Sequence, residues 1–144
     1  MEVGDVVIDP FIEEHLGTNS YDVRLGPQLR TYMLPDHSKP VHRPPDAYAL
    51  DMCKPTPCRV HTIPDEGFLL QPGTLYLGHT MESVGTAAKY VPHIEGRSSV
   101  GRLGIAVHIT AGFGDVGFQG IWTLEITVVH PVRVYAGERI AQAY

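Results

Sequence analysis

The sequence lacks the features of a membrane-spanning, a secreted or a nucleic-acid-wrapping protein. Its 144 residues contain no apolar run close to the roughly 20 residues that cross a bilayer. The opening MEVGDVVIDPF has no basic leader before an apolar stretch, which a signal peptide would show. Lys and Arg number 11 against 16 Asp and Glu, whereas wrapping nucleic acid requires clustered positive charge. We therefore expect a cytoplasmic protein, or one in the equivalent compartment of an infected cell, with neither a membrane nor a nucleic acid as partner.

Cysteine is also scarce, and its arrangement argues against a protein-built metal centre. Cys53 and Cys58 are the only cysteines, in the segment CKPTPC. Two thiols cannot complete a zinc site, and a Pro-rich spacer resembles no metal-binding knuckle. The eight His residues show no pair at tight ligand spacing. We interpret the cysteines as incidental loop thiols and expect no metal ligands from the protein.

Glycine and proline, by contrast, are abundant and divide the chain into short pieces. Fifteen Gly and twelve Pro favour a β-rich fold over a helical one. From residue 59 onward, runs rich in Val, Ile, Thr and Tyr alternate with turn signals such as PDEG and QPG. We predict one all-β domain over residues 1–144, a small barrel or a jelly-roll-like sandwich. The predicted strands are RVHTI, GFLLQ, TLYLGHT, KYVPHIEG, GIAVHIT, GIWTLEITVV, PVRVYAG and GERIAQAY.

Three segments depart from this strand pattern. Apolar residues at mixed spacing in residues 1–26 allow a short helix around Ile12 to Leu16. Residues 35–58 hold six prolines and predict a long irregular loop, a kind often found at functional or subunit surfaces. RSSVGRLG, residues 97–104, predicts a turn or a second short helix.

The segment EGRSSVGRLG, residues 95–104, has the residue types of a phosphate site. Arg97 and Arg102 bracket Ser98 and Ser99, with glycines between them. Guanidinium forks suit phosphate oxygens, hydroxyls add donors, and glycines let backbone N–H groups come close. The same composition also describes a polar turn with solvated arginines, and the residues alone leave both interpretations open.

The segment HITAGFGDVGFQGIWTLE, residues 108–125, carries two carboxylates. Asp115 sits in a glycine-rich bend, and Glu125 lies in an otherwise apolar strand. Strand alternation places Ile121, Thr123 and Glu125 on the less apolar face. That face lines a pocket, where the carboxylate could do acid–base work, or it meets solvent. Alternation does not decide between the two.

Together, these segments resemble the signature of the dCTP deaminase family within the dCTP deaminase and dUTPase superfamily. IDPF and NSYDVRLG, residues 8–11 and 19–26, are similar to that family's opening motif. GERIAQAY resembles a closing motif that dCTP deaminases share with trimeric dUTPases. The matches lie at the start, middle and end of the chain, in the family's order. The resemblance implies a dUTPase-type fold, a distorted β-barrel with one or two short helices, and a homotrimer with active sites between subunits.

The resemblance also assigns roles to matching positions. Glu125 would be the general base and proton shuttle when water attacks C4 of cytosine. Ser98 and Arg102 would organise the catalytic water, the base and the phosphates. The substrate-binding positions would be Arg97 and Ser99 for phosphate, Thr110, Ala111 and Gly112 for the pyrimidine edge and the water, Phe118 for the deoxyribose, and Gln142 for the nucleotide site.

The family deaminates without zinc, and the implied metal is Mg²⁺ held mainly by the triphosphate. Zinc deaminases combine H-x-E with P-C-x-x-C, and this combination does not occur in the sequence. His108 falls inside a matched motif, and we interpret it as structural, through strand packing or hydrogen bonding.

The leading interpretation is deamination of dCTP to dUTP and ammonia, which would make the chain a hydrolase of a cyclic amidine C–N bond. A plain dUTPase is the first alternative, because Asp115 stands where dUTPases activate water for attack on the α-phosphate. Against it, the opening motif is SYDVRLG, not the AGYDL type, and Glu125 has no catalytic counterpart in dUTPases.

A bifunctional enzyme would convert dCTP directly to dUMP, ammonia and pyrophosphate. TAGF is more similar to this branch than to the TAHR form of single-activity enzymes, and we favour the bifunctional interpretation narrowly. A non-catalytic nucleotide-binding regulator on the same fold is a further alternative, since fold does not fix function. The intact Ser98, Arg102 and Glu125 argue against it.

The sequence departs from the family pattern in two places. FGDVGF, with Gly114 and Val116, replaces the bulkier FIDPGF, so we expect a looser bend and altered substrate choice, a modified cytosine included. The sequence ends at Tyr144, directly after the closing motif, where relatives continue into a segment that folds over the triphosphate. We expect this lid to be absent, either because the chain is naturally short or because the tail has been removed.

Overall fold

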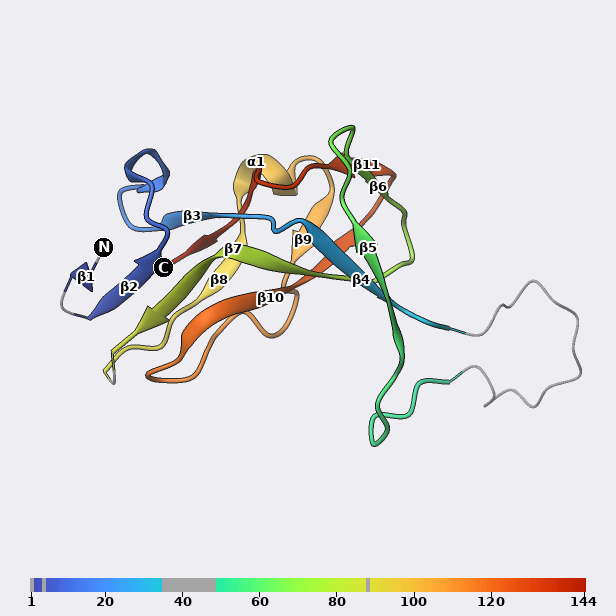
Figure 1. Ribbon diagram of the computed structural model, residues 1–144, viewed down its shortest axis with the longest axis horizontal. Helices are drawn as coiled ribbons and strands as arrows, with labels where there is room; N and C mark the ends of the chain where they lie inside the picture. The colour runs from blue at the N-terminus through green and yellow to red at the C-terminus, as the bar shows by residue number, and fades with distance from the viewer. Residues whose placement is uncertain (1, 4, 35–48, 88) are drawn as a thin grey trace, which may run out of the picture.

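The computed structural model describes residues 2–3, 5–34, 49–87 and 89–144, and these form almost entirely β-strands (Figure 1). None of the helices in these ranges is long and apolar enough to cross a membrane. The strands are β1 (Glu2–Val3), β2 (Val6–Asp9), β3 (Tyr21–Arg24), β4 (Gln28–Tyr32), β5 (Cys58–Thr62), β6 (Phe68–Leu70), β7 (Tyr76–Thr86), β8 (Ile94–Gly96), β9 (Ile105–Val107), β10 (Gln119–Val128), β11 (Val132–Val134) and β12 (Arg139–Ala143).

The two expected short helices are present. A 3₁₀ helix, η1 (Glu13–His15), falls within the first expected helical segment. A single α-helical turn, α1 (Ser98–Gly101), falls within RSSVGRLG. Of the expected long loop, residues 35–48 lie outside the described residues, residues 49–57 form no strand, and β5 begins at Cys58.

The first 34 residues contain more strand than the sequence pattern predicted, and β7 is longer than its predicted run. The sequence analysis missed β2, β3 and β4, which have four or five residues each. Apolar residues at mixed spacing in residues 1–26 gave no clear strand period there. β7 continues to Thr86 through the polar stretch MES. The all-β prediction is confirmed, but the strands are less evenly spaced than the turn signals implied.

The largest sheet runs in the order β1-β2-β7-β10-β9, with β4 joined to both β5 and β7. β7 and β10 lie side by side at its centre (Figure 1). In β10, alternate residues from Trp122 to Val128 are buried and pack into a single apolar core. Burying a side chain such as Leu124 or Ile126 completely contributes about 2 kcal/mol, so this face fixes the strand's register.

β7 carries a bulge opposite Trp122. Ile121 pairs with Ser83 and Thr123 pairs with His79, so three residues of β7 face Trp122 alone. The Trp122 backbone N–H donates to the Thr80 hydroxyl at 2.9 Å, and this hydroxyl donates to the Glu82 carbonyl at 2.7 Å. The Thr80 side chain thus supplies the hydrogen bonds that the interrupted ladder cannot make.

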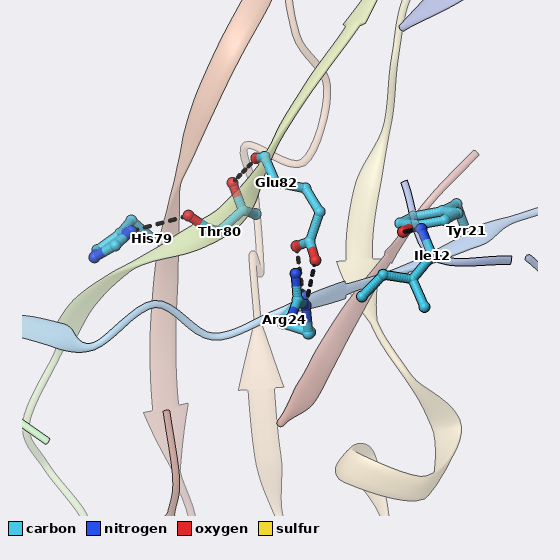
Figure 2. A network of polar contacts seen from close by, with 6 residues as sticks. All are labelled: Ile12, Tyr21, Arg24, His79, Thr80 and Glu82. Carbon is cyan, nitrogen blue, oxygen red and sulfur yellow. Dashed lines mark hydrogen bonds and ion pairs between the residues drawn. The ribbon is translucent and has the colours of Figure 1, made fainter. Parts of the chain in front are cut away.

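A fully buried carboxylate beside this bulge links β7 to β3 (Figure 2). Glu82 Oε1 accepts from Arg24 Nε at 2.5 Å, and Oε2 accepts from the Arg24 backbone N–H at 2.8 Å. A carboxylate withdrawn from water requires such a partner. The pair joins residues that are 58 positions apart in the sequence.

A three-stranded sheet in the order β3-β12-β8 stands beside the main one. Its central strand aligns three polar residues in one row, because Gln142 pairs with Asp22 on one side and with Glu95 on the other. β8 leads directly into α1. This sheet therefore brings the opening motif, the closing motif and the RSSVGR segment together.

Candidate functional site

Two neighbouring pockets share one residue, His108, and together hold much of the predicted site. The first has a volume of about 420 Å³, and the second about 330 Å³. The first is lined by His108, Ala111, Phe113, Gly114, Asp115, Phe118, Ile121, Trp122, Thr123 and Glu125. The second is lined by Glu95, Gly96, Arg97, Ser98, Gly101, Ile105, Ala106, Val107, His108 and Ile109.

β10 places Glu125 in the first pocket. Its predicted face-mates Ile121 and Thr123 line the same pocket, while Leu124 and Ile126 are fully buried on the other face. The Glu125 carbonyl accepts the His108 N–H at 3.0 Å, which fixes the end of β9 against β10. Alternation left open whether this face of the strand lines a pocket or meets solvent, and in the structure it lines a pocket.

Asp115 reaches this pocket from a tight bend that packs on Trp122. The Phe118 N–H donates to the Asp115 carbonyl at 3.1 Å, and the Phe118 ring meets the Trp122 ring edge-on at 5.4 Å. A Cβ on Gly114 would lie 2.4 Å from Trp122 Cη2, so a larger residue here would displace the tryptophan. The glycine that departs from the family pattern thus allows close packing between the bend and the pocket wall.

His108, which we interpreted from the sequence as a structural residue, lines both pockets. It has a φ of 53°, the left-handed region that side chains larger than glycine seldom adopt. Both ring nitrogens are shielded from solvent, and neither forms a hydrogen bond of full geometry with any described residue. His108 instead forms its hydrogen bond through the backbone, from its N–H to the Glu125 carbonyl. Burial lowers the pKa of His108, partly offset by the Glu125 carboxylate and the Thr123 backbone, which favours a neutral imidazole. A non-glycine residue at positive φ is not visible in sequence.

The short helix α1 presents the serines and arginines. The Arg102 N–H donates to the Ser98 carbonyl at 3.1 Å, so these residues are one turn apart on the same side. Arg97 precedes the helix and, with Ser98, lines the second pocket. Ser99 and Arg102 are exposed and line neither pocket. Thr110, Gly112 and Gln142 also lie outside both linings.

An acidic residue that the prediction omitted holds Arg97. Asp22 Oδ1 is 2.9 Å from Arg97 Nε, and Asp22 Oδ2 is 3.2 Å from Arg139 Nη1. Asp22 lies within the opening motif that the sequence analysis identified. Its pairing with arginines of the other two motifs could not be predicted from the sequence. Among the described residues, no group of three or more His, Cys, Asp or Glu side chains could hold a metal ion.

These strands and pockets define an all-β protein with a carboxylate-bearing pocket beside an Arg/Ser helix turn. A family model described as dCTP deaminase-like matches residues 1–143, and the chain belongs to this family. The dCTP deaminase, dUMP-forming, of Leptospira biflexa is 51% identical over 140 residues, which cover 97% of this chain and 72% of that relative. The protein of the same name from Clostridium acetobutylicum is 49% identical, over 97% of this chain and 73% of the relative.

The fold is also found among solved structures. The crystal structure of 2'-deoxycytidine 5'-triphosphate deaminase from Agrobacterium tumefaciens matches with a TM-score of 0.68 at 22% identity, over 96% of this chain. The chain spans 42% of the length of that protein. The all-β fold of the dUTPase type that the sequence motifs implied is thereby confirmed.

Proposed function

We propose that this chain deaminates dCTP and carries the product on to dUMP, releasing ammonia and pyrophosphate. The observation that carries the proposal is that Glu125 and Asp115, one carboxylate for each hydrolytic step, line a single pocket. The relatives that are about half identical to the chain are dUMP-forming, which favours the bifunctional reaction over simple deamination.

In the first step, Glu125 accepts a proton from water as the water oxygen bonds to C4 of cytosine. The carboxylic acid then returns this proton to the 4-amino group, the C4–N bond breaks, and ammonia leaves. The remaining hydroxyl proton passes to N3 through the Glu125 carboxylate as the C4 carbonyl of uracil forms. His108 and Trp122 line the same pocket as Glu125.

In the second step, a water deprotonated by Asp115 attacks the α-phosphorus, and the bond to the bridging oxygen breaks to release pyrophosphate. Arg97, Ser98, Ser99 and Arg102 would contact the phosphates, and Gln142 would line the nucleotide site. Thr110, Ala111 and Gly112 would meet the pyrimidine edge, and Phe118 the deoxyribose. Ala111 and Phe118 lie in the pocket of Glu125, which supports these two assignments.

The proposal includes Mg²⁺ bound through the triphosphate and no zinc. Oxygen-rich triphosphate is a preferred ligand of Mg²⁺, which needs few protein ligands in such sites. Bound there, Mg²⁺ would neutralise phosphate charge. We expect EDTA to stop pyrophosphate release and a zinc-selective chelator to leave both steps unchanged; the reverse result would contradict this assignment.

We also propose a homotrimer with active sites between subunits. The exposed positions of Ser99 and Arg102, outside the pocket of Glu125, support a site that a second subunit completes. Light scattering coupled to size-exclusion chromatography should give three times the mass of the chain. Mixing inactive Glu125→Gln with inactive Arg102→Ala subunits should restore part of the activity if the two residues act across an interface.

The deciding experiment is chromatography of the products formed from dCTP and Mg²⁺, with a parallel dUTP reaction. Formation of dUMP and pyrophosphate from dCTP supports the bifunctional reaction, while accumulation of dUTP would reduce the function to deamination. Turnover of dUTP alone would make the chain a dUTPase, and turnover of neither would favour a nucleotide-binding regulator or a modified substrate.

Replacement of the proposed base gives a direct check. Glu125→Gln keeps the shape of the side chain but removes its proton-accepting charge, so ammonia release should fall by at least about 10²-fold. Nucleotide binding and assembly should persist. Glu13→Gln, an exposed position in η1, is the matched control and should leave the rate unchanged.

A further inference from the structure

Asp22 stands where three segments distant in the sequence meet. It lies in β3, and its two carboxylate oxygens contact arginines from two other elements. Arg97 comes from the junction of β8 and α1, and Arg139 opens β12. The Asp22 side chain retains only 15% of its exposure, and that of Arg97 only 22%, so this contact is enclosed more than a surface ion pair.

The terminal Nη groups of Arg97 are available to bind a ligand. Asp22 contacts Nε, and no other ion pair or hydrogen bond of the Arg97 guanidinium occurs among the described residues. The terminal Nη groups, which form the fork that suits phosphate oxygens, thus remain for a ligand. Arg97 lines the second pocket next to Ser98, so the fork belongs to the proposed phosphate side of the site.

We propose that Asp22 is a positioning residue that holds Arg97, and with it Arg139, in the orientation that receives the phosphate chain of the nucleotide. This inference rests on the proposed function, since it concerns the same site. A long arginine side chain otherwise samples many rotamers, and ordering it before the ligand arrives removes that entropic penalty from binding. Asp22 touches no reacting atom and acts only through the arginines.

An alternative role for Asp22, neutralising the charge of the arginines, predicts the opposite change in nucleotide affinity when Asp22 is removed. If Asp22 merely neutralised the arginines, it would compete with phosphate for them, and its removal would tighten binding. If it orders them, its removal weakens binding even though the site becomes more positive. The direction of the change therefore separates positioning from charge competition.

The experiment is carried out in a Glu125→Gln background, which should bind dCTP without deaminating it, and compares this parent with its Asp22→Ala and Asp22→Asn derivatives. Calorimetry gives the affinity of each for dCTP with Mg²⁺ and for deoxycytidine, which has no phosphate. We expect Asp22→Ala to weaken dCTP binding about 10-fold or more, with a smaller loss in the same direction for Asp22→Asn. Deoxycytidine affinity should not change. Asp51→Asn, which removes the exposed ion pair with Lys54, is the matched control and should leave dCTP binding unchanged.

A double-mutant cycle identifies the route of the effect. In an Arg97→Ala background, adding Asp22→Ala should weaken dCTP binding less than it does when Arg97 is present, because only Arg139 remains for Asp22 to act through. Unchanged or tighter dCTP binding in Asp22→Ala, a parallel loss of deoxycytidine affinity, or an undiminished effect without Arg97 would each overturn the proposal. Because binding is measured without turnover, a failure of the proposed reaction in the wild type would be seen separately, in its products.

Discussion

β3 carries two charged residues, Asp22 and Arg24, on the same side of the strand, and their ion pairs differ in environment. Arg24 pairs with Glu82, whose side chain is fully buried between the sheets (Figure 2). Asp22 pairs with Arg97, which follows β8, and with Arg139 in β12, and Arg139 keeps 42% of its exposure.

This difference in burial separates an ion pair that stabilises the fold from one that can take part in ligand binding. Breaking a buried pair leaves a charge without water or partner, which is strongly destabilising. A pair that water still reaches contributes less to the free energy of unfolding than a fully buried one, because water can solvate either partner when the other is lost. The contacts of Asp22 can therefore change when a ligand binds without unfolding the protein, whereas loss of the Arg24–Glu82 pair would destabilise the fold.

The largest expected effect comes from breaking the buried pair. Arg24→Ala should lower the free energy of unfolding by about 3–5 kcal/mol, because Glu82 would remain buried and unpaired. Urea denaturation followed by circular dichroism measures this change. Arg30→Ala, at an exposed position in β4, should stay within about 0.5 kcal/mol of wild type and is the control. A loss below about 1 kcal/mol in Arg24→Ala would remove the distinction between the two pairs.

Replacing both buried partners sharpens the comparison. Arg24→Met together with Glu82→Leu should be clearly more stable than Arg24→Ala alone, since no uncompensated charge remains. The same urea titration reports the difference. A double variant as unstable as the single one would mean that backbone geometry, through the Arg24 N–H bond to Glu82, matters more than charge pairing.

The open pair should behave differently. Asp22→Asn should change the free energy of unfolding by about 1 kcal/mol or less, although it weakens nucleotide binding. Repeating the denaturation at high NaCl should narrow even this gap, because salt screens exposed charges. A loss comparable to that of Arg24→Ala would make Asp22 a structural residue and would undercut its proposed positioning role.

His108 extends the comparison to a half-buried titratable side chain whose ring nitrogens form no hydrogen bond of full geometry with any described residue. Burial lowers its pKa, so on acidification the unfolded chain takes up a proton before the folded one does. Its stabilising contribution is complete above the ordinary histidine pKa of about 6.5 and is lost as the pH falls through the lowered folded value. His108→Asn, which tolerates positive φ, should therefore show a shallower loss of Tm on acidification. An identical pH profile would contradict this.

Local pattern predicted much of the site because its signals are local. The alternation from Ile121 to Glu125 placed these residues on one face, which lines the pocket, and RSSVGRLG, predicted to be a turn or a short helix, contains α1. The alternation of buried Tyr21 and Val23 with half-buried Asp22 and Arg24 also existed in the sequence, but the mixed apolar spacing of residues 1–26 obscured it.

The remainder depends on contacts that no window of sequence contains. Nothing near Glu82 indicates that it is buried, because its partner Arg24 is far away in the chain and the bulge at Thr80 is set by Trp122. Asp22 was within a recognised motif, yet its role emerges only when β12 and β8 bring Arg139 and Arg97 to it. The roles assigned to Ser99, Arg102 and Gln142 stay predictions.

The order of strands in the small sheet has a consequence for synthesis of the protein. β12, the last of the described strands, is the one that separates β3 from β8. While the ribosome is still adding residues before Arg139, the opening motif and the Arg/Ser segment have no strand to join them. The Asp22–Arg97 contact can therefore be stabilised only after β12 has been synthesised, and a nascent chain arrested before that point should not yet bind nucleotide, however well its main sheet has formed.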